Sequence, residues 1–186
     1  VKFAQARRNR QSSSGTAWWL DAKGEGAGPY DNMEQRPLAE RCLLGFGPVA
    51  GPPMFPTLYN NLKRIVQTED SVMILAEMVH DARVIRLNSE HRADHIRTWL
   101  GDSVGHWEGD TLVVETTNFT KQPALYGADE NLQVTERFTR LDDDTLSYSF
   151  VVTDPTIWSE PWGGEYPWPE TDDKVYEYAC HEGNYS

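Results

Sequence analysis

A period-2 alternation of mostly apolar with mostly polar residues near the middle of the chain constrains the fold more than any other feature. Between Leu146 and Thr153, inward-type residues such as Tyr148 and Phe150 alternate with serines, and the run from Gln133 to Phe138 shows the same period of two. That period is typical of strands with one buried face. The aspartates between Leu141 and Thr145 favour a tight turn, so the two runs are predicted to form one antiparallel hairpin.

Further strand-like runs flank this hairpin on both sides. The sequence Glu108-Gly109-Asp110 predicts a second tight turn, between His106-Trp107 and the β-branched run Thr111 to Thr117. Short runs separated by polar turns predict four more strands: Arg64 to Thr68, Ser71 to Val79, Arg83 to Leu87 and Lys174 to Ala179. Residues 91–99 read as a short helix or loop, and the segment from Trp158 to Trp168, rich in Pro and Gly, reads as a loop. The predicted fold is all-β: an antiparallel meander of about eight strands curled into a calycin-like barrel or half-barrel.

The first 60 residues differ in character from the rest. They contain many glycines and prolines and little periodicity, yet they also carry large apolar residues such as Trp18, Trp19 and Leu44. Such side chains would not stay solvated in a free tail. We therefore expect a single chain of 186 residues to comprise an extended arm, residues 1–60, packed on a barrel-like domain, residues 61–186.

Charge and hydropathy exclude two classes of partner. The formal net charge is −12, which repels the phosphate backbone of nucleic acids. The chain has no run of 18 apolar residues, so no membrane span is predicted. It begins at Val1 without a signal-peptide pattern, which favours a processed chain.

Two cysteines, Cys42 and Cys180, lie far apart in the sequence and outside any CxxC spacing. They are compatible with one disulfide in an oxidising compartment, or with two buried thiols in a reducing one. The spacing leaves both possibilities open.

Four motifs together carry a resemblance to a known family. They are ERC at residues 40–42, WLGDS at 99–103, WEGDTLVV at 107–114 and YEYACHEGNY at 176–185. Over residues 31–186 the chain resembles a family of uncharacterised exported bacterial proteins. The resemblance implies a periplasmic or extracellular location and, through it, a disulfide. That family has no established activity, so the resemblance assigns no catalytic residue.

Ionisable residues inside the predicted strands supply candidates for acid–base chemistry. Glu77 and Glu136 interrupt apolar patterns, and a buried carboxylate near a histidine such as His80 or His181 is the minimum equipment of a general acid–base catalyst. If Glu136 faces inward, burial raises its pKa unless a cation such as Arg83, Arg97 or Arg137 reaches it. A carboxylate paired with arginine is a structural strut, and for Glu136 taken alone we favour the strut.

Two other motifs are weaker. The sequence Gly101-Asp102-Ser103-Val104-Gly105 matches a nucleophile elbow, but an elbow needs a strand before the serine and a helix after it, whereas a strand-like run follows here. We therefore expect Ser103 to lie in a loop, exposed or bonded to a turn. The five histidines, His80, His91, His95, His106 and His181, would place two imidazoles on one side of a helix only at the 91/95 spacing. We predict no bound metal and no cofactor.

The aromatic content is high, with seven tryptophans. The candidate ligand-binding residues are four of these: Trp107, Trp158, Trp162 and Trp168. Rings of this kind line pocket mouths and stack on sugars, although packing of a long loop explains them equally well. The sequence thus predicts a protein that encloses a small organic molecule or glycan. It is either a cofactor-free acid–base enzyme (a lyase, isomerase or hydrolase) or a non-catalytic binding module, and a histidine-ligated metalloenzyme ranks lower.

Overall fold

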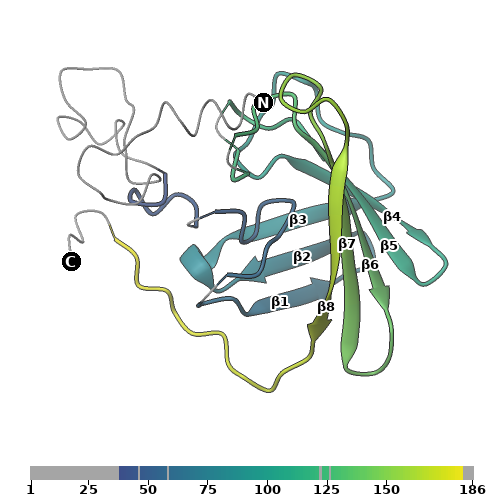
Figure 1. The fold of residues 1–186 in the computed structure, drawn as a ribbon. Helices are drawn as coiled ribbons and strands as arrows, with labels where there is room; N and C mark the ends of the chain where they lie inside the picture. Colours follow the sequence, from purple (N-terminus) through teal and green to yellow (C-terminus); the bar gives the residue numbers. More distant parts are fainter. Residues whose placement is uncertain (1–37, 46, 58, 122, 126, 182–186) are drawn as a thin grey trace.

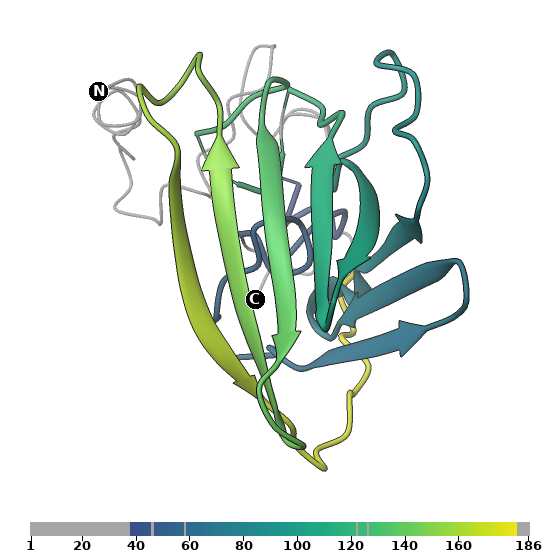
Figure 2. The same cartoon turned by 90° about the vertical axis from the view of Figure 1, so that its right-hand side faces the viewer.

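The chain forms one eight-stranded sheet curled into a half-barrel (Figures 1 and 2). This computed structural model describes residues 38–45, 47–57, 59–121, 123–125 and 127–181. The strands, with one short 3-10 helix, are β1 (Lys63–Gln67), β2 (Ser71–Ala76), η3 (Met78–His80), β3 (Ala82–Leu87), β4 (Asp102–Glu108), β5 (Thr111–Thr117), β6 (Gln133–Arg140), β7 (Thr145–Thr153) and β8 (Trp162–Pro169). Their spatial order follows the sequence, so the all-β half-barrel predicted from the alternating pattern is confirmed.

The central hairpin has the register that its alternation predicts. Val134 pairs with Val152 and Phe138 with Tyr148, and all four side chains are buried on the concave side of the sheet. The hairpin between β4 and β5 turns at Gly109, whose φ of 59° lies in the left-handed region that favours glycine.

One pair of neighbouring strands departs from the predicted antiparallel meander, and we call it the parallel joint. Strands β3 and β4 pair in parallel, with Ile85 opposite Ser103 and Leu87 opposite Gly105, while every other neighbouring pair is antiparallel. A parallel pair needs a crossover connection, and residues 88–101 supply it. This segment, expected as a short helix or loop, is irregular and contains one isolated bridge, between Thr98 and Phe119. In both views β1 to β3 run crosswise to β7 and β8.

The prediction of the last strand was wrong. Residues 174–179 are irregular, and the eighth strand is instead the segment with Pro167 and Pro169 that was expected to be a loop. Proline removes a backbone donor, which excludes it from central strands but not from an edge. Since β8 is the last strand in the sheet order, it needs hydrogen bonds to β7 on one side only. The run predicted to reach Val79 also ends early, because Val79 and His80 have positive φ.

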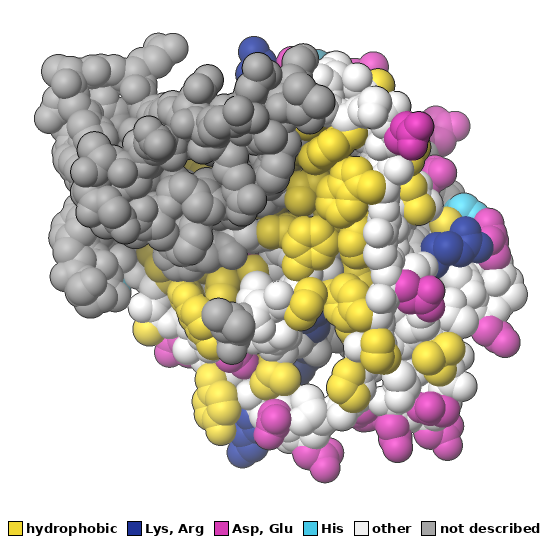
Figure 3. All heavy atoms as spheres, viewed as in Figure 1, with side chains coloured by type: hydrophobic (Ala, Val, Ile, Leu, Met, Phe, Trp, Pro, Cys, Tyr) yellow, Lys and Arg dark blue, Asp and Glu magenta, His cyan; other side chains and the backbone are white. Residues whose placement is uncertain are grey.

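The core lies on the concave side of the sheet and is strongly aromatic. Its buried residues come from β2, β3, β5, β6 and β7, from the loops beside them, and from the segment before β1, which supplies Met54. Partly buried aromatic residues of β8, Trp162, Tyr166 and Trp168, pack against it. Figure 3 shows hydrophobic side chains gathered beside β7 and β8.

The segment before β1 is tied to the end of the chain. Cys42 and Cys180 form a disulfide with a Cα separation of 5.7 Å across 138 residues of sequence, which confirms the predicted bridge. Ala39, Leu44 and Val49 are buried. The first 37 residues of the expected arm, with Trp18 and Trp19, lie outside the described residues. In the part of the chain that the structure describes, no helix is long and apolar enough to cross a membrane.

Candidate functional site

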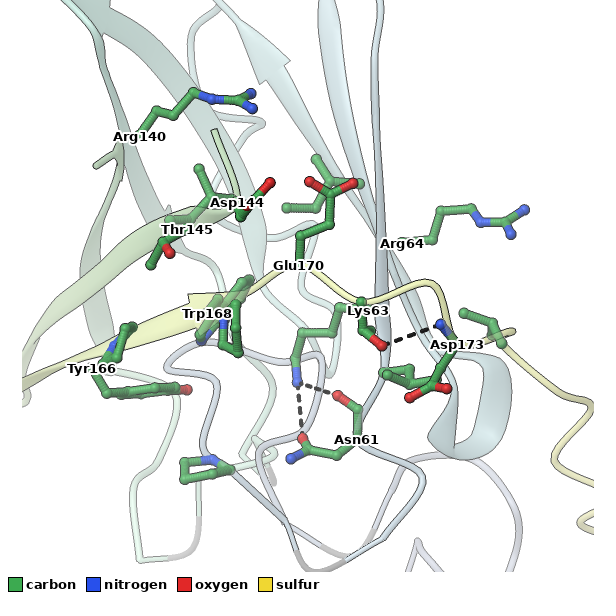
Figure 4. Close-up of a pocket in the computed structure, with 18 of the residues that line it drawn as sticks. Asn61, Lys63, Arg64, Arg140, Asp144, Thr145, Tyr166, Trp168, Glu170 and Asp173 are labelled. Carbon is green, nitrogen blue, oxygen red and sulfur yellow. Dashed lines mark hydrogen bonds between the residues drawn. The ribbon is translucent and has the colours of Figure 1, made fainter. Parts of the chain in front are cut away.

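The half-barrel does not close between its two edge strands, and a pocket of about 830 Å³ lies at this seam (Figure 4). Strands β1 and β8 form two of its walls, and the β6–β7 turn and the segment after β8 form the others. Its polar and aromatic lining comprises Asn61, Lys63, Arg64, Arg140, Asp143, Asp144, Thr145, Tyr166, Trp168, Glu170, Thr171 and Asp173. We call this the seam pocket.

The aromatic wall of the seam pocket is held by the core. The ring of Trp168 stacks on Tyr148 with centroids 4.8 Å apart and meets Phe138 edge-on at 5.7 Å. The hydroxyl of Tyr166 donates a hydrogen bond to the carbonyl oxygen of Met54, and burial raises the pKa of Tyr166 to about 12. Because these rings are fixed by packing and hydrogen bonding, the wall is formed before any ligand arrives.

Lys63 and Arg64 are the polar residues that β1 contributes to the lining, and Lys63 lies next to the aromatic wall. Its ammonium donates hydrogen bonds to the carbonyl oxygen and to Oδ1 of Asn61, at 3.3 and 3.2 Å, and lies 5.3 Å from the ring centroid of Trp168. Burial lowers the pKa of Lys63 from 10.5 to about 8, because a desolvated ammonium is less stable than a hydrated one. Period-2 alternation along β1 puts this lysine on the same face as Ile65, another lining residue.

Carboxylates gather at the end of the seam pocket formed by the β6–β7 turn. Asp143 and Asp144 lie in this turn, and the backbone N–H of Glu170 donates a 2.7 Å hydrogen bond to the carbonyl oxygen of Asp144. That bond fixes the segment after β8 against the turn. The pocket therefore has an amine beside an aromatic wall, and at the turn it has carboxylate acceptors together with the guanidinium of Arg140.

Glu136 belongs to a buried network on the concave side. Its carboxylate accepts two hydrogen bonds from Arg83, at 2.6 and 3.1 Å, and one of 2.7 Å from the hydroxyl of Tyr148. Glu136 has no exposed surface and the Arg83 side chain is 2% exposed. The Tyr148 hydroxyl in turn accepts a hydrogen bond from the backbone N–H of Met54. This geometry matches the interpretation of Glu136 as a structural strut, with Arg83 as the cation that pairs with it.

The other three candidate acid–base residues lie in other surroundings. Glu77 is buried next to η3, where it accepts hydrogen bonds from Asn60 Nδ2 at 2.6 Å and from the backbone N–H of Tyr176 at 3.3 Å. His80 and His181 are exposed. Among its described lining residues, the seam pocket includes none of the four.

The four candidate tryptophans lie in different parts of the structure. Trp168 lines the seam pocket. Trp158 and Trp162 meet edge-on, with centroids 5.5 Å apart, and pack against the core. Trp107, on β4, is 45% exposed and is not part of the described lining.

Ser103 is not in a loop as the sequence predicted. It lies in β4, buried, with its Oγ 2.9 Å from Oγ1 of Thr116 on β5. The loop prediction failed because the strand begins at Asp102, before the serine rather than after it. The serine is enclosed between strands, so the elbow hypothesis fails as well.

Two of the five histidines lie beside carboxylates. His91 Nδ1 lies 3.2 Å from Asp102, and His106 Nε2 lies 3.3 Å from Glu108. Among the described residues, no group of three or more His, Cys, Asp or Glu side chains is arranged to hold a metal ion.

Lys63, Tyr166 and the carboxylates of the β6–β7 turn line the seam pocket but were not among the residues that the sequence singled out. A signal for Lys63 was present: it begins an alternating run, so one face of that run combines a lysine with an apolar residue. The contribution of Tyr166 had no local signal, since it depends on the proline-containing strand β8.

Comparison with known proteins adds nothing to this geometry: no protein-family model matches the chain, and no curated protein or solved structure matches it either.

Proposed function

We propose that this protein is a non-catalytic binding module that holds a small hydroxylated molecule, such as a mono- or oligosaccharide, in the seam pocket. The observation that carries the proposal is the preformed wall of Trp168 and Tyr166 in a pocket that also contains polar side chains. Its volume of about 830 Å³ lies within the usual range of small-molecule sites, about 300 to 1,000 Å³.

The chemistry of the lining supports a hydroxylated ligand. A sugar ring has an apolar face that stacks on an aromatic side chain and an edge of hydroxyl groups that donate hydrogen bonds. An ionised carboxylate accepts hydrogen bonds and donates none, and Asp144, Glu170 and Asp173 supply such acceptors in the lining of the seam pocket. The same lining holds Thr145, which both donates and accepts.

Binding is favoured over acid–base catalysis by the positions of the candidate catalytic groups. The carboxylate of Glu136 is occupied by Arg83 and Tyr148, and that of Glu77 by Asn60 and a backbone N–H. These two networks share no residue. A general base needs a free lone pair within reach of its substrate.

We also propose that the protein acts outside the cytoplasm. The disulfide between Cys42 and Cys180 supports this location, because such bonds persist in oxidising compartments. Extracellular or periplasmic glycans would be accessible to it there.

Calorimetric titration with a panel of neutral and acidic saccharides tests the proposal. We expect at least one member to bind, and we expect Trp168→Ala to abolish that binding while Trp107→Ala, outside the described lining, leaves it unchanged. Because Trp168 also packs on the core, a second variant, Thr145→Arg, fills the pocket without removing a core ring. Binding that survives Thr145→Arg in a folded variant would place the ligand elsewhere and refute the proposal.

A further inference from the structure

We propose that the ligand of the seam pocket carries a carboxylate that pairs with Lys63, so that the pocket selects sugar acids over neutral sugars. This inference rests on the proposed function and adds the chemical class of the ligand.

Lys63 is a partly buried cation whose described partners are all neutral. They are two oxygen atoms of Asn61 and the ring of Trp168. In the described part of the chain, none of the ion pairs includes Lys63, although carboxylates of other residues line the same pocket. Burial of an ammonium group without a counter-ion is unfavourable.

A ligand carboxylate would supply the missing counter-ion. An ammonium group has three N–H donors. Two are directed to Asn61, which leaves one for a ligand that enters over Trp168. The low pKa of Lys63, about 8, is consistent with a site that lacks an anion, since a nearby negative charge would raise it.

The opposite side of the seam pocket fixes the orientation of such a ligand. In Figure 4, Lys63, Asn61 and Asp173 lie on one side of Trp168, and Asp144, Glu170 and Arg140 lie on the other. A ligand carboxylate would be repelled by Asp144 and Glu170, whereas hydroxyl groups would donate to them. The arrangement therefore matches a molecule with an acid at one end and hydroxyl groups at the other.

Glucuronate and glucose are the matched probes, because they differ by a carboxylate at one carbon. We expect calorimetry to give about tenfold or tighter binding of glucuronate, the usual magnitude for a hydrogen bond to a charged group. Lys63→Met should remove this preference, so that glucuronate binds no more tightly than glucose. Lys63→Arg should retain the preference, and Lys174→Met, an exposed lysine outside the described lining, should not alter either affinity.

The outcomes separate the two proposals. Equal affinity for both probes, with both lost in Thr145→Arg, would refute the role of Lys63 and leave saccharide binding intact. A preference for glucuronate that survives Lys63→Met in a folded variant would also refute it. Absence of binding by either probe would overturn the inference, and absence across the whole saccharide panel would overturn the proposed function with it.

Discussion

Replacing Glu136 with glutamine should destabilise the protein severely. The substitution keeps the shape of the side chain but removes its charge, and it turns an amide N–H₂ toward donors on Arg83 or Tyr148. The guanidinium of Arg83 would remain buried with no compensating charge, because its side chain is only 2% exposed.

The magnitude follows from the burial of this pair. Removing one partner of a buried ion pair destabilises proteins by about 3 to 5 kcal/mol, because the other charge stays desolvated. For a chain of this size each kcal/mol lowers Tm by about 2 to 4 °C. We therefore expect Tm to fall by about 6 to 20 °C in Glu136→Gln.

Urea unfolding and calorimetry measure the effect, and the chain offers a matched control. Glu108 pairs with Arg137 on the exposed side of the same sheet, so Glu108→Gln should leave Tm nearly unchanged. The double variant Arg83→Met with Glu136→Leu should recover much of the loss, since no unpaired charge remains buried. A decrease of less than about 1 kcal/mol in the free energy of unfolding of Glu136→Gln would refute the strut interpretation, because a buried arginine without a counter-ion costs more than that.

Three further predictions concern other parts of the chain. Reduction of the Cys42–Cys180 disulfide, or replacement of both cysteines by serine, should destabilise the protein by up to about 5 kcal/mol, because the bridge closes a loop of more than a hundred residues. If mass spectrometry finds two alkylated thiols in the unreduced protein, no bridge exists. Gly101→Ala should destabilise by about 2 kcal/mol or more, since φ is +72° there and an added Cβ would lie 2.7 Å from a backbone oxygen; a Tm equal to that of the wild type contradicts the geometry. Burial lowers the pKa of Lys63 below its unfolded value, so the folded state loses this proton first and the free energy of unfolding should rise by up to about 2 kcal/mol between pH 8 and 10. Lys63→Met should be more stable than the wild type at pH 7 and should lack this rise. A wild-type free energy of unfolding that stays constant over this pH range, measured by denaturant titration, would argue against the shift.

The fold could be predicted from the sequence where the alternation within each strand and the turn between two strands indicated the same pairing. Alternation over Gln133–Arg140 and Thr145–Thr153 identified two strands, and the aspartate-rich turn between them identified their pairing. The parallel joint was not predictable, because alternation does not tell which direction a strand runs. Strand β8 was missed since prolines usually break strands, and only its position at the edge of the sheet makes them tolerable.

The candidate site was less predictable than the fold. The period of two indicated that Glu136 could face inward, where it would need a cation such as Arg83, Arg97 or Arg137. The structure supplies Arg83. The seam pocket depends on how far the sheet curls, which no local pattern encodes. Of the proposed tryptophans, only Trp168 lies there, because its place is set by β8.

The parallel joint between β3 and β4 has a consequence for how the native protein opens. It divides the sheet into two antiparallel units, β1 to β3 and β4 to β8, each built from neighbours in sequence. Only three residue pairs, from Ile85↔Ser103 to Leu87↔Gly105, form the ladder between them. Cooperative units that exchange amide protons separately often coincide with such supersecondary blocks. Since β1 belongs to the smaller block and β8 to the larger, separation at this joint would pull the two walls of the seam pocket apart, and a bound ligand would slow amide exchange in both blocks at once.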